Sequence, residues 1–84
     1  MSIQNQLAAM TALQGQYLAF IYAYTKIHRQ PPAEADMRAY FEVTPPSVHR
    51  MVLELERKGF ISRQPGRPRS IQLLVDPERL PILR

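Results

Sequence analysis

Two proline pairs, at positions 31–32 and 45–46, divide the first part of this 84-residue chain into separate helical segments. Proline inside a helix removes a hydrogen bond and clashes with the preceding turn, so a helix ends before such a pair. At the first helical position proline is tolerated, because its missing amide hydrogen would be unpaired there anyway. Pro31-Pro32 therefore ends one helix, whereas Pro45-Pro46, which follows the good N-cap residue Thr44, begins another.

The segment before the first proline pair is predicted to be a helix over about 11–28. Thr11 and Gln14 fit the capping box, in which two side chains bind open amides of the first turn. Apolar residues then recur at spacings of three and four: Leu13, Tyr17, Phe20, Ile21, Tyr24 and Ile27. This spacing puts them on one face of the helix, which is expected to contact the core.

Two more helices are predicted, one at about 33–41 and one from Pro45 to about 58. Glu34 and Asp36 are acids of the kind that favour a first helical turn. In the third helix, apolar residues stand at helical spacing: Val48, Met51, Val52 and Leu55. Gly59 follows, where a left-handed residue would close the helix, and Glu42-Val43 forms the turn between the two helices.

Residues 60–64 and 70–75 are predicted to be short strands, because a turn rich in proline and glycine separates them. Three helices and a hairpin predict a mainly α fold with a small antiparallel β-hairpin (α+β), a winged helix-turn-helix with a three-helix core plus a wing. The predicted domain spans 11–75. An N-terminal extension occupies 1–10, and a C-terminal tail at 76–84 either docks on the domain or stays loose.

Basic residues are concentrated at the end of the third helix and in the wing. The net charge is +4 and the pI is about 10.0, which favours nucleic acid or an anionic membrane surface as partner. The segment 57–75 has no acidic residue and five basic ones: Arg57, Lys58, Arg63, Arg67 and Arg69. The longest apolar run, 17–24, is far shorter than the roughly 20 residues of a membrane-spanning helix.

Several short stretches, taken in order, resemble the DNA-binding domain of the LexA repressor family and, more loosely, winged-helix regulators of the MarR type. These stretches are Met10-Thr11 with Gln14, Pro31-Pro32, Val43-Thr44-Pro45-Pro46-Ser47-Val48, Leu55-Glu56-Arg57-Lys58-Gly59-Phe60-Ile61 and Arg69-Ser70-Ile71-Gln72-Leu73-Leu74. The resemblance implies that the third helix enters the major groove of DNA. Glu42 stands where the family usually has glycine, so a different turn geometry is expected there. Ala33 replaces the usual hydroxyl N-cap, which weakens that helix start by about 1 kcal/mol.

Candidate DNA-binding residues lie on the third helix and in the wing. Inward-facing apolar residues leave an outward set: Thr44, Pro46, Ser47, His49 and Arg50. Arginine fits guanine O6 and N7, so Arg50 is the candidate base reader, with a phosphate contact or a solvated side chain as alternatives. Basic residues add further candidates: Lys58, Arg63, Arg67 and Arg69. Gly66-Arg67-Pro68 also forms the centre of the AT-hook motif, and the alternative is a hairpin turn with arginines near phosphates.

The predicted function is sequence-specific binding of double-stranded DNA by a cytoplasmic transcriptional regulator that acts as a pair. The alternatives are a protein-interaction module on a winged-helix scaffold and non-specific DNA binding. No enzyme activity, metal site, cofactor or small-molecule ligand is expected, because the chain has no cysteine and Ser47 and His49 face different ways. The chain ends at Arg84, so the self-cleaving peptidase domain of the LexA repressor, and dimerisation through it, are not expected.

Overall fold

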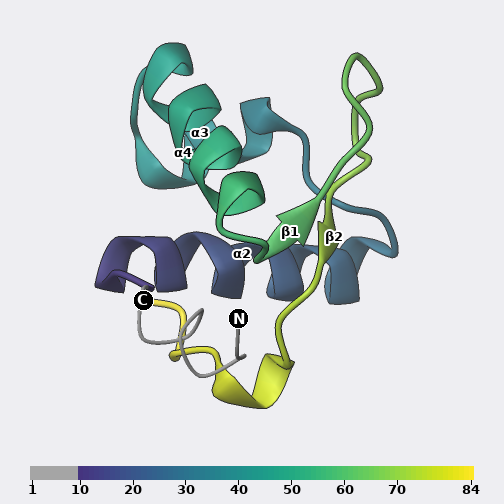
Figure 1. Ribbon diagram of the computed structural model, residues 1–84. Coiled ribbons are helices and arrows are strands. Elements are labelled where there is room, and N and C mark those ends of the chain that lie inside the picture. The colour runs from purple at the N-terminus through teal and green to yellow at the C-terminus, as the bar shows by residue number, and fades with distance from the viewer. Residues whose placement is uncertain (1–9) are drawn as a thin grey trace.

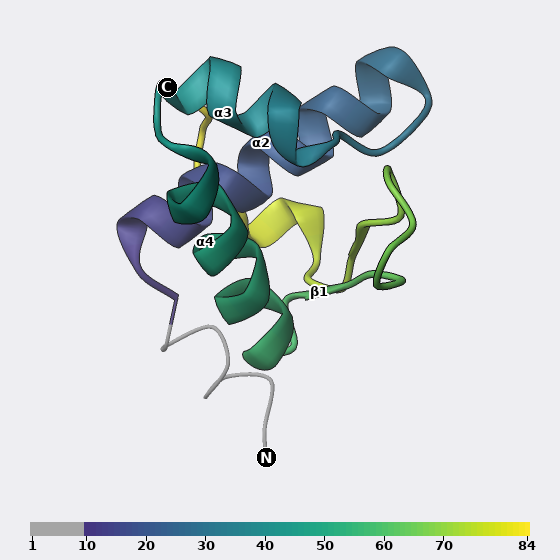
Figure 2. The same cartoon turned by 90° about the horizontal axis from the view of Figure 1, so that it is seen from above.

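Three helices, a two-stranded hairpin and a C-terminal tail make up the computed structural model, which describes residues 10–84 (Figure 1). In chain order the elements are α2 (Ala12–His28), α3 (Glu34–Phe41), α4 (Pro45–Arg57), β1 (Ile61–Ser62), β2 (Gln72–Leu73) and the 3-10 helix η1 (Pro77–Arg79). α3 and α4 pack together over α2, and the hairpin rises beside α4 (Figure 2). This arrangement confirms the predicted winged helix-turn-helix. The predicted extension at 1–10 lies, except for Met10, outside the described residues.

α2 begins at the capping box that the sequence predicted. The Gln14 N–H donates to Thr11 Oγ1 and the Thr11 N–H donates to Gln14 Oε1, each over 3.1 Å. These bonds satisfy two amides that no helical carbonyl can reach. The helix ends at His28, and Arg29 turns the chain with a left-handed backbone, φ 61°. Both predicted ends of this helix are therefore confirmed.

The buried face of α2 differs from the predicted apolar stripe. Leu13 and Ile27 are 54% and 74% exposed, so their predicted place in the core is wrong. Leu18, which the predicted stripe omits, is fully buried. The physical reason is that neighbouring elements cover the middle of α2 and not its ends. The middle turns pack against other elements, including β2, on more than one side, whereas Leu13 and Ile27 lie in the first and last turns. Periodicity defines a face of a helix and does not define how far its neighbours extend.

α3 begins without a hydroxyl cap, as the alanine at position 33 predicted. Asp36 compensates, because its Oδ2 accepts a hydrogen bond from the Ala33 N–H over 2.8 Å and its charge lies near the positive end of the helix. The helix ends at Phe41, and the C-cap residue Glu42 has a left-handed backbone with φ 55°. Glycine adopts this conformation most readily. A different turn geometry was expected at Glu42 because the LexA repressor family, which the sequence resembles, usually has glycine there. That expectation is wrong, since Glu42 adopts the backbone conformation typical of glycine.

α4 is closed at both ends by the residues that the sequence predicted. Thr44 Oγ1 accepts a hydrogen bond from a first-turn N–H over 3.4 Å, and Pro45 opens that turn. At the other end Gly59 has φ 79°, and the Phe60 N–H donates to the Leu55 carbonyl over 3.0 Å. This is the hydrogen bond of a Schellman cap, which turns the chain from α4 into β1.

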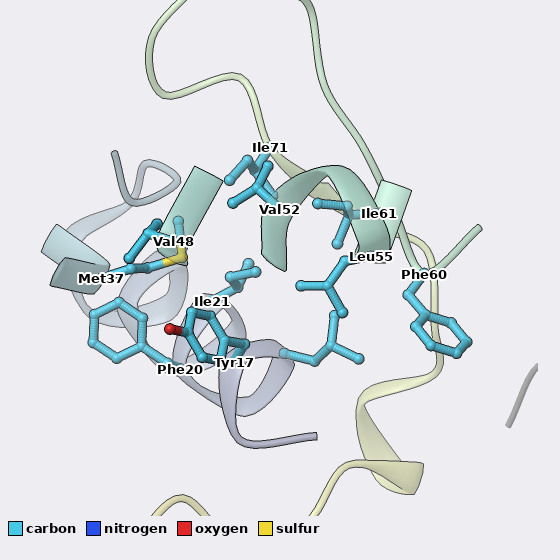
Figure 3. Close-up of a cluster of buried hydrophobic side chains, with 11 residues drawn as sticks. Tyr17, Phe20, Ile21, Met37, Val48, Val52, Leu55, Phe60, Ile61 and Ile71 are labelled. Carbon is cyan, nitrogen blue, oxygen red and sulfur yellow. The ribbon is translucent and has the colours of Figure 1, made fainter. Parts of the chain in front are cut away.

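The hydrophobic core lies between α2, α3, α4 and the hairpin (Figure 3). Its buried members are Tyr17, Leu18, Phe20, Ile21, Met37, Val48, Val52, Leu55, Phe60, Ile61 and Ile71. Val48, Val52 and Leu55, all from α4, are each 0% exposed. Full burial of one such side chain stabilises the fold by about 1.5–3 kcal/mol. The rotation of α4 about its axis is therefore set by apolar packing.

The hairpin is shorter than predicted. β1 and β2 are antiparallel and two residues long each, whereas strands were predicted over 60–64 and 70–75. The register pairs are Ile61 with Leu73 and Ser62 with Gln72. Toward the wing, the Gln64 N–H donates to Ser70 Oγ over 2.9 Å, so a side chain takes the place of the next backbone partner. The ladder ends there and leaves the wing as a loop.

The C-terminal tail docks on the domain, which decides between the two alternatives for 76–84. The Gln16 side chain donates to the Ile82 carbonyl over 3.0 Å and accepts from the Arg84 N–H over 2.9 Å. Leu80 and Leu83 pack against the core. The tail covers α2 on the side opposite to the wing (Figure 1). Among the described residues, no helix has the length and apolar character needed to cross a membrane.

Candidate nucleic-acid interface

The outward side of α4 is formed as predicted, because three buried residues fix its rotation. Val48, Val52 and Leu55 point into the core. Thr44, Pro46, His49 and Arg50 are exposed and Ser47 is half-buried. We call these five residues the α4 surface. The side chains predicted to meet base edges therefore come from one side of one helix.

Thr44 and Ser47 are bonded to each other in the first turn. Besides accepting the capping hydrogen bond, Thr44 Oγ1 donates to Ser47 Oγ over 3.1 Å. The proton of the Thr44 hydroxyl is thus used within the chain, whereas the Ser47 hydroxyl donates to no acceptor in the described part of the chain. Of the two hydroxyls, that of Ser47 is the one placed to donate to a phosphate or a base.

His49 faces an acidic side chain of α3. Its Nδ1 lies 3.1 Å from Glu34 Oε2, and both side chains are well exposed. A protonated His49 forms an ion pair with Glu34, which offsets part of the positive charge that the imidazolium presents to a phosphate. A neutral ring that donates from Nδ1 to Glu34 leaves Nε2 as an acceptor. Glu34 therefore influences both roles that His49 can have toward DNA.

Arg50 is the exposed cation of the α4 surface. Within residues 10–84 it makes no ion pair and no side-chain hydrogen bond. Its guanidinium keeps all five N–H donors in their planar, fork-like arrangement. The whole hydrogen-bonding capacity of this side chain is thus available to a partner.

The wing loop, residues 64–70, carries Arg67 at its turn. The Arg67 N–H donates to the Gln64 carbonyl over 3.1 Å, and the intervening Gly66 has φ 77°. Together with Pro65 these are features of a type II turn. The Arg67 guanidinium is exposed and donates to Gln64 Oε1 over 3.2 Å, with no carboxylate partner among the described residues. The turn therefore presents Arg67 to solvent.

Three other predicted DNA contacts are engaged within the protein. The contacts are Lys58 Nζ to Gln14 Oε1 at 3.0 Å, Arg63 Nε to Glu56 Oε1 at 3.1 Å and Arg69 Nη1 to Asp36 Oδ2 at 3.0 Å. Sequence reasoning missed these partners. The first and third pairs are 44 and 33 residues apart, so no local pattern signals them. Binding of these three cations to phosphate would compete with contacts that already exist.

His49 of the α4 surface and most of the wing loop line one open groove between α4, the start of α3 and the wing. Its lining residues are Pro32, Ala33, Glu34, His49, Val52, Arg63, Gly66, Arg67, Pro68, Arg69, Ser70 and Ile71. The first turns of α4 and the wing loop also rise on the same side of α2, away from the tail (Figure 1). The two predicted contact regions thus share one side of the molecule, as a surface that straddles a duplex requires.

Contacts at the base of the wing shift two pKa values. Partial burial raises the pKa of Asp36, but the Ala33 N–H, the Arg69 charge and a hydrogen bond from Tyr24 outweigh it, so the pKa is lowered from the ordinary 3.8. The pKa of Arg69 is raised, first by its hydrogen bond with Tyr24 and, against the effect of desolvation, by Asp36. Both members of this ion pair are therefore charged at neutral pH.

Potential metal ligands are dispersed in the described part of the chain. Among residues 10–84, no three His, Cys, Asp or Glu side chains come together in a way that could hold a metal ion. His49 and Glu34 form a pair that no third such side chain from the described segment completes.

Comparison with known proteins identifies the family. The profile of the LexA DNA binding domain matches residues 7–70, which is most of the chain. The chain belongs to the LexA DNA-binding domain family. The LexA repressor of Thermosipho africanus is 38% identical over 87% of this chain and 37% of its own length. The LexA repressors of Bartonella quintana (35% identical; 84% of this chain, 30% of the relative) and Thermosipho melanesiensis (37%; 77% and 33%) are also similar. The chain thus spans about a third of the length of these relatives.

The LexA family match begins at residue 7, before α2, continues through the wing loop and stops before β2. Two departures from the LexA pattern, Ala33 and Glu42, fall inside it. Asp36 accepts a hydrogen bond from the Ala33 N–H at the start of α3, and Glu42 adopts the left-handed backbone that suits glycine. Neither departure prevents the helix-turn-helix from forming.

Proposed function

We propose that this LexA-family chain is a transcriptional regulator that binds duplex DNA in a sequence-specific way. In the proposed complex the first half of α4 lies in the major groove, which admits one α-helix, and the wing loop lies on the flanking DNA. The observation that carries the proposal is the groove shared by α4 and the wing loop. Membership of the LexA family supports it and disfavours the alternative of a protein-interaction module.

Arg50 is the proposed base-reading residue. Its guanidinium, which has no partner within residues 10–84, can donate two hydrogen bonds to guanine O6 and N7, a contact worth about 1–3 kcal/mol of discrimination. Ser47 and His49 are the proposed neighbouring contacts to phosphate or base. Thr44 and Pro46 complete the proposed contact surface at the start of α4, where Thr44 acts mainly as the helix cap.

Arg67 is the proposed DNA contact of the wing. Because it has no carboxylate partner, binding it to a phosphate or in the minor groove breaks no ion pair among the described residues. An A·T preference beside the main site would indicate minor-groove insertion, and no base preference there would indicate a phosphate contact. Lys58 and Arg63 are proposed as weaker DNA contacts, since each already has a partner, whereas Arg69, which is held by Asp36, is not proposed as a direct contact.

The proposed regulator acts as a homodimer on a pseudo-palindromic site in the cytoplasm, by binding alone and without catalysis or a cofactor. A single small winged helix makes few base contacts, so specificity commonly comes from two copies. Two copies would place their α4 helices one helical turn of DNA, about 34–36 Å, or a multiple of it apart.

Selection of bound sites from a random duplex library tests this function. We expect one motif to be enriched, to be lost in Arg50→Ala, and to be kept in the control Arg79→Ala, which removes an arginine from η1 on the other side of α2. Specific binders prefer their site over random duplex by about 10³-fold or more. Recovery of random sequences by the unaltered chain would contradict the proposal.

A further inference from the structure

Arg69 links the wing to the body of the domain. Its Nη1 donates to Tyr24 Oη over 3.0 Å, to Asp36 Oδ2 over 3.0 Å and to the Pro31 carbonyl over 3.3 Å. These acceptors come from α2, from the segment after α2 and from α3. One side chain of the wing thus contacts three separate parts of the helical body.

Arg69 makes both hydrogen bonds and a cation–π contact with its partners. Tyr24 and Asp36 both accept hydrogen bonds from Arg69 Nη1, so the guanidinium joins the two side chains. The Arg69 guanidinium also lies 5.9 Å from the centre of the Tyr24 ring, within the range of a cation–π contact. We call Tyr24, Asp36 and Arg69 the wing anchor. Its hydrogen-bonding partners hold the Arg69 guanidinium against α2 and α3.

The backbone of Arg69 shows that the anchored conformation has a cost. Its φ is 55°, in the left-handed region that disfavours residues with a Cβ. Such a conformation persists when surrounding contacts determine it. The next residue, Ser70, donates to the Arg67 carbonyl over 2.9 Å and accepts from the Gln64 N–H. Ser70 therefore closes the loop on itself, while Arg69 attaches the closed loop to the domain.

We infer that Arg69 is a positioning residue, whose contacts with Tyr24 and Asp36 fix the wing loop so that Arg67 faces the duplex bound by α4. This inference rests on the proposed DNA binding for its functional part, while the attachment of the wing is a property of the unbound protein. The two arginines of the wing loop therefore have different proposed roles: Arg67 contacts DNA, and Arg69 orients the loop.

The competing account is that Arg69 is simply a phosphate ligand. The two accounts differ in the effect of Tyr24→Phe, which removes one hydroxyl, leaves every charge in place and keeps the ring that packs beside Phe20. The matched control is Tyr22→Phe on the same helix, whose side chain faces solvent and is absent from the anchor. The salt dependence of binding also separates the two accounts of Arg69, because each neutralised phosphate contributes about −0.9 to the slope of log K against log salt.

The first measurement uses the unbound chain, with backbone NMR order parameters of residues 64–69. We expect Tyr24→Phe and Arg69→Ala to lower the order of the wing loop, and Tyr22→Phe to leave it unchanged. Unchanged order in both anchor variants would overturn the inference, whatever the outcome with DNA.

The second measurement is affinity and salt slope on the duplex obtained by selection. We expect Tyr24→Phe to weaken binding by about two- to tenfold, the effect of one lost hydrogen bond, with the slope unchanged. Arg69→Ala should also weaken binding without the slope change of a lost phosphate contact. If Arg69→Ala reduces the slope by about 0.9 and Tyr24→Phe binds normally, Arg69 is a phosphate ligand and the inference fails. Absence of specific binding by the unaltered chain would instead refute the proposed function, and the order parameters would still test the anchor.

Discussion

The first turns of α4 and the wing loop lie on the same side of α2, yet their arginines differ in the partners that they have within the domain. On α4, Arg50 extends from a helix fixed by buried apolar residues and has no partner within residues 10–84. In the wing, Arg69 and the nearby Arg63 are paired with Asp36 and Glu56. A run of basic residues in a sequence therefore overstates the charge that the folded domain offers to DNA.

The two regions also differ in what positions them. Apolar burial sets α4, and its strength depends little on salt or on moderate changes of pH. Hydrogen bonds and an ion pair set the wing, so its position is expected to respond to acid and to loss of single polar groups. We therefore expect α4 to determine which sequence is bound and the wing to adjust how tightly it is bound.

The largest effect is expected at Arg50. Arg50→Ala should cost about 1–3 kcal/mol of binding free energy on the selected duplex and should relax the preference at one base pair. Competition binding with duplexes altered at each position measures both effects. Loss of affinity that is equal for all sequences would mean that Arg50 contacts phosphate, and α4 would lose its assigned role as the specific element.

The next effect separates the arginines of the wing. Arg67→Ala should weaken binding to all duplexes and reduce the salt slope by about 0.9, whereas Arg63→Ala should change the slope less because its ion pair with Glu56 already competes. Salt titration of both variants, with Arg79→Ala as control, gives the comparison. Equal slope changes for Arg67 and Arg63 would remove the distinction between available and engaged cations.

Local signals were sufficient for most of the fold. The capping box of Thr11, the cap at Thr44 and the closing Gly59 all act on residues within a few positions, so the helix ends followed from the sequence. The anchor of Arg69 could not be predicted in this way, because Asp36 is 33 residues distant and meets it only in the packed domain. For the same reason the exposure of Leu13 was missed.

Acid is expected to weaken the wing before it affects α4. The pKa of Asp36 is lowered in the folded protein, so its ion pair contributes stability above the ordinary value of 3.8, and this contribution is lost as the pH falls through the lowered pKa. Thermal unfolding over this range should show a smaller acid-induced loss of stability in Asp36→Asn than in the unaltered chain. Identical pH profiles would show that the pair contributes no stability.

The smallest effect is expected at the turn that leads into α4. Glu42→Gly should raise the free energy of unfolding by up to about 1 kcal/mol, because φ 55° suits glycine and strains glutamate. Ala39→Gly, in the exposed middle of α3, is the matched control and should lower stability by about 0.5–1 kcal/mol. Denaturant unfolding measures both, and a destabilised Glu42→Gly would show that the glutamate side chain supports the turn.

Mapping the DNA-bound surface residue by residue tests the central claim most directly. Backbone amide shifts, recorded while the selected duplex is added, should change mainly at 44–50 and 64–69 and should change little in the tail at 76–84. Changes concentrated in the tail and η1, with the α4 amides unaltered, would contradict the account.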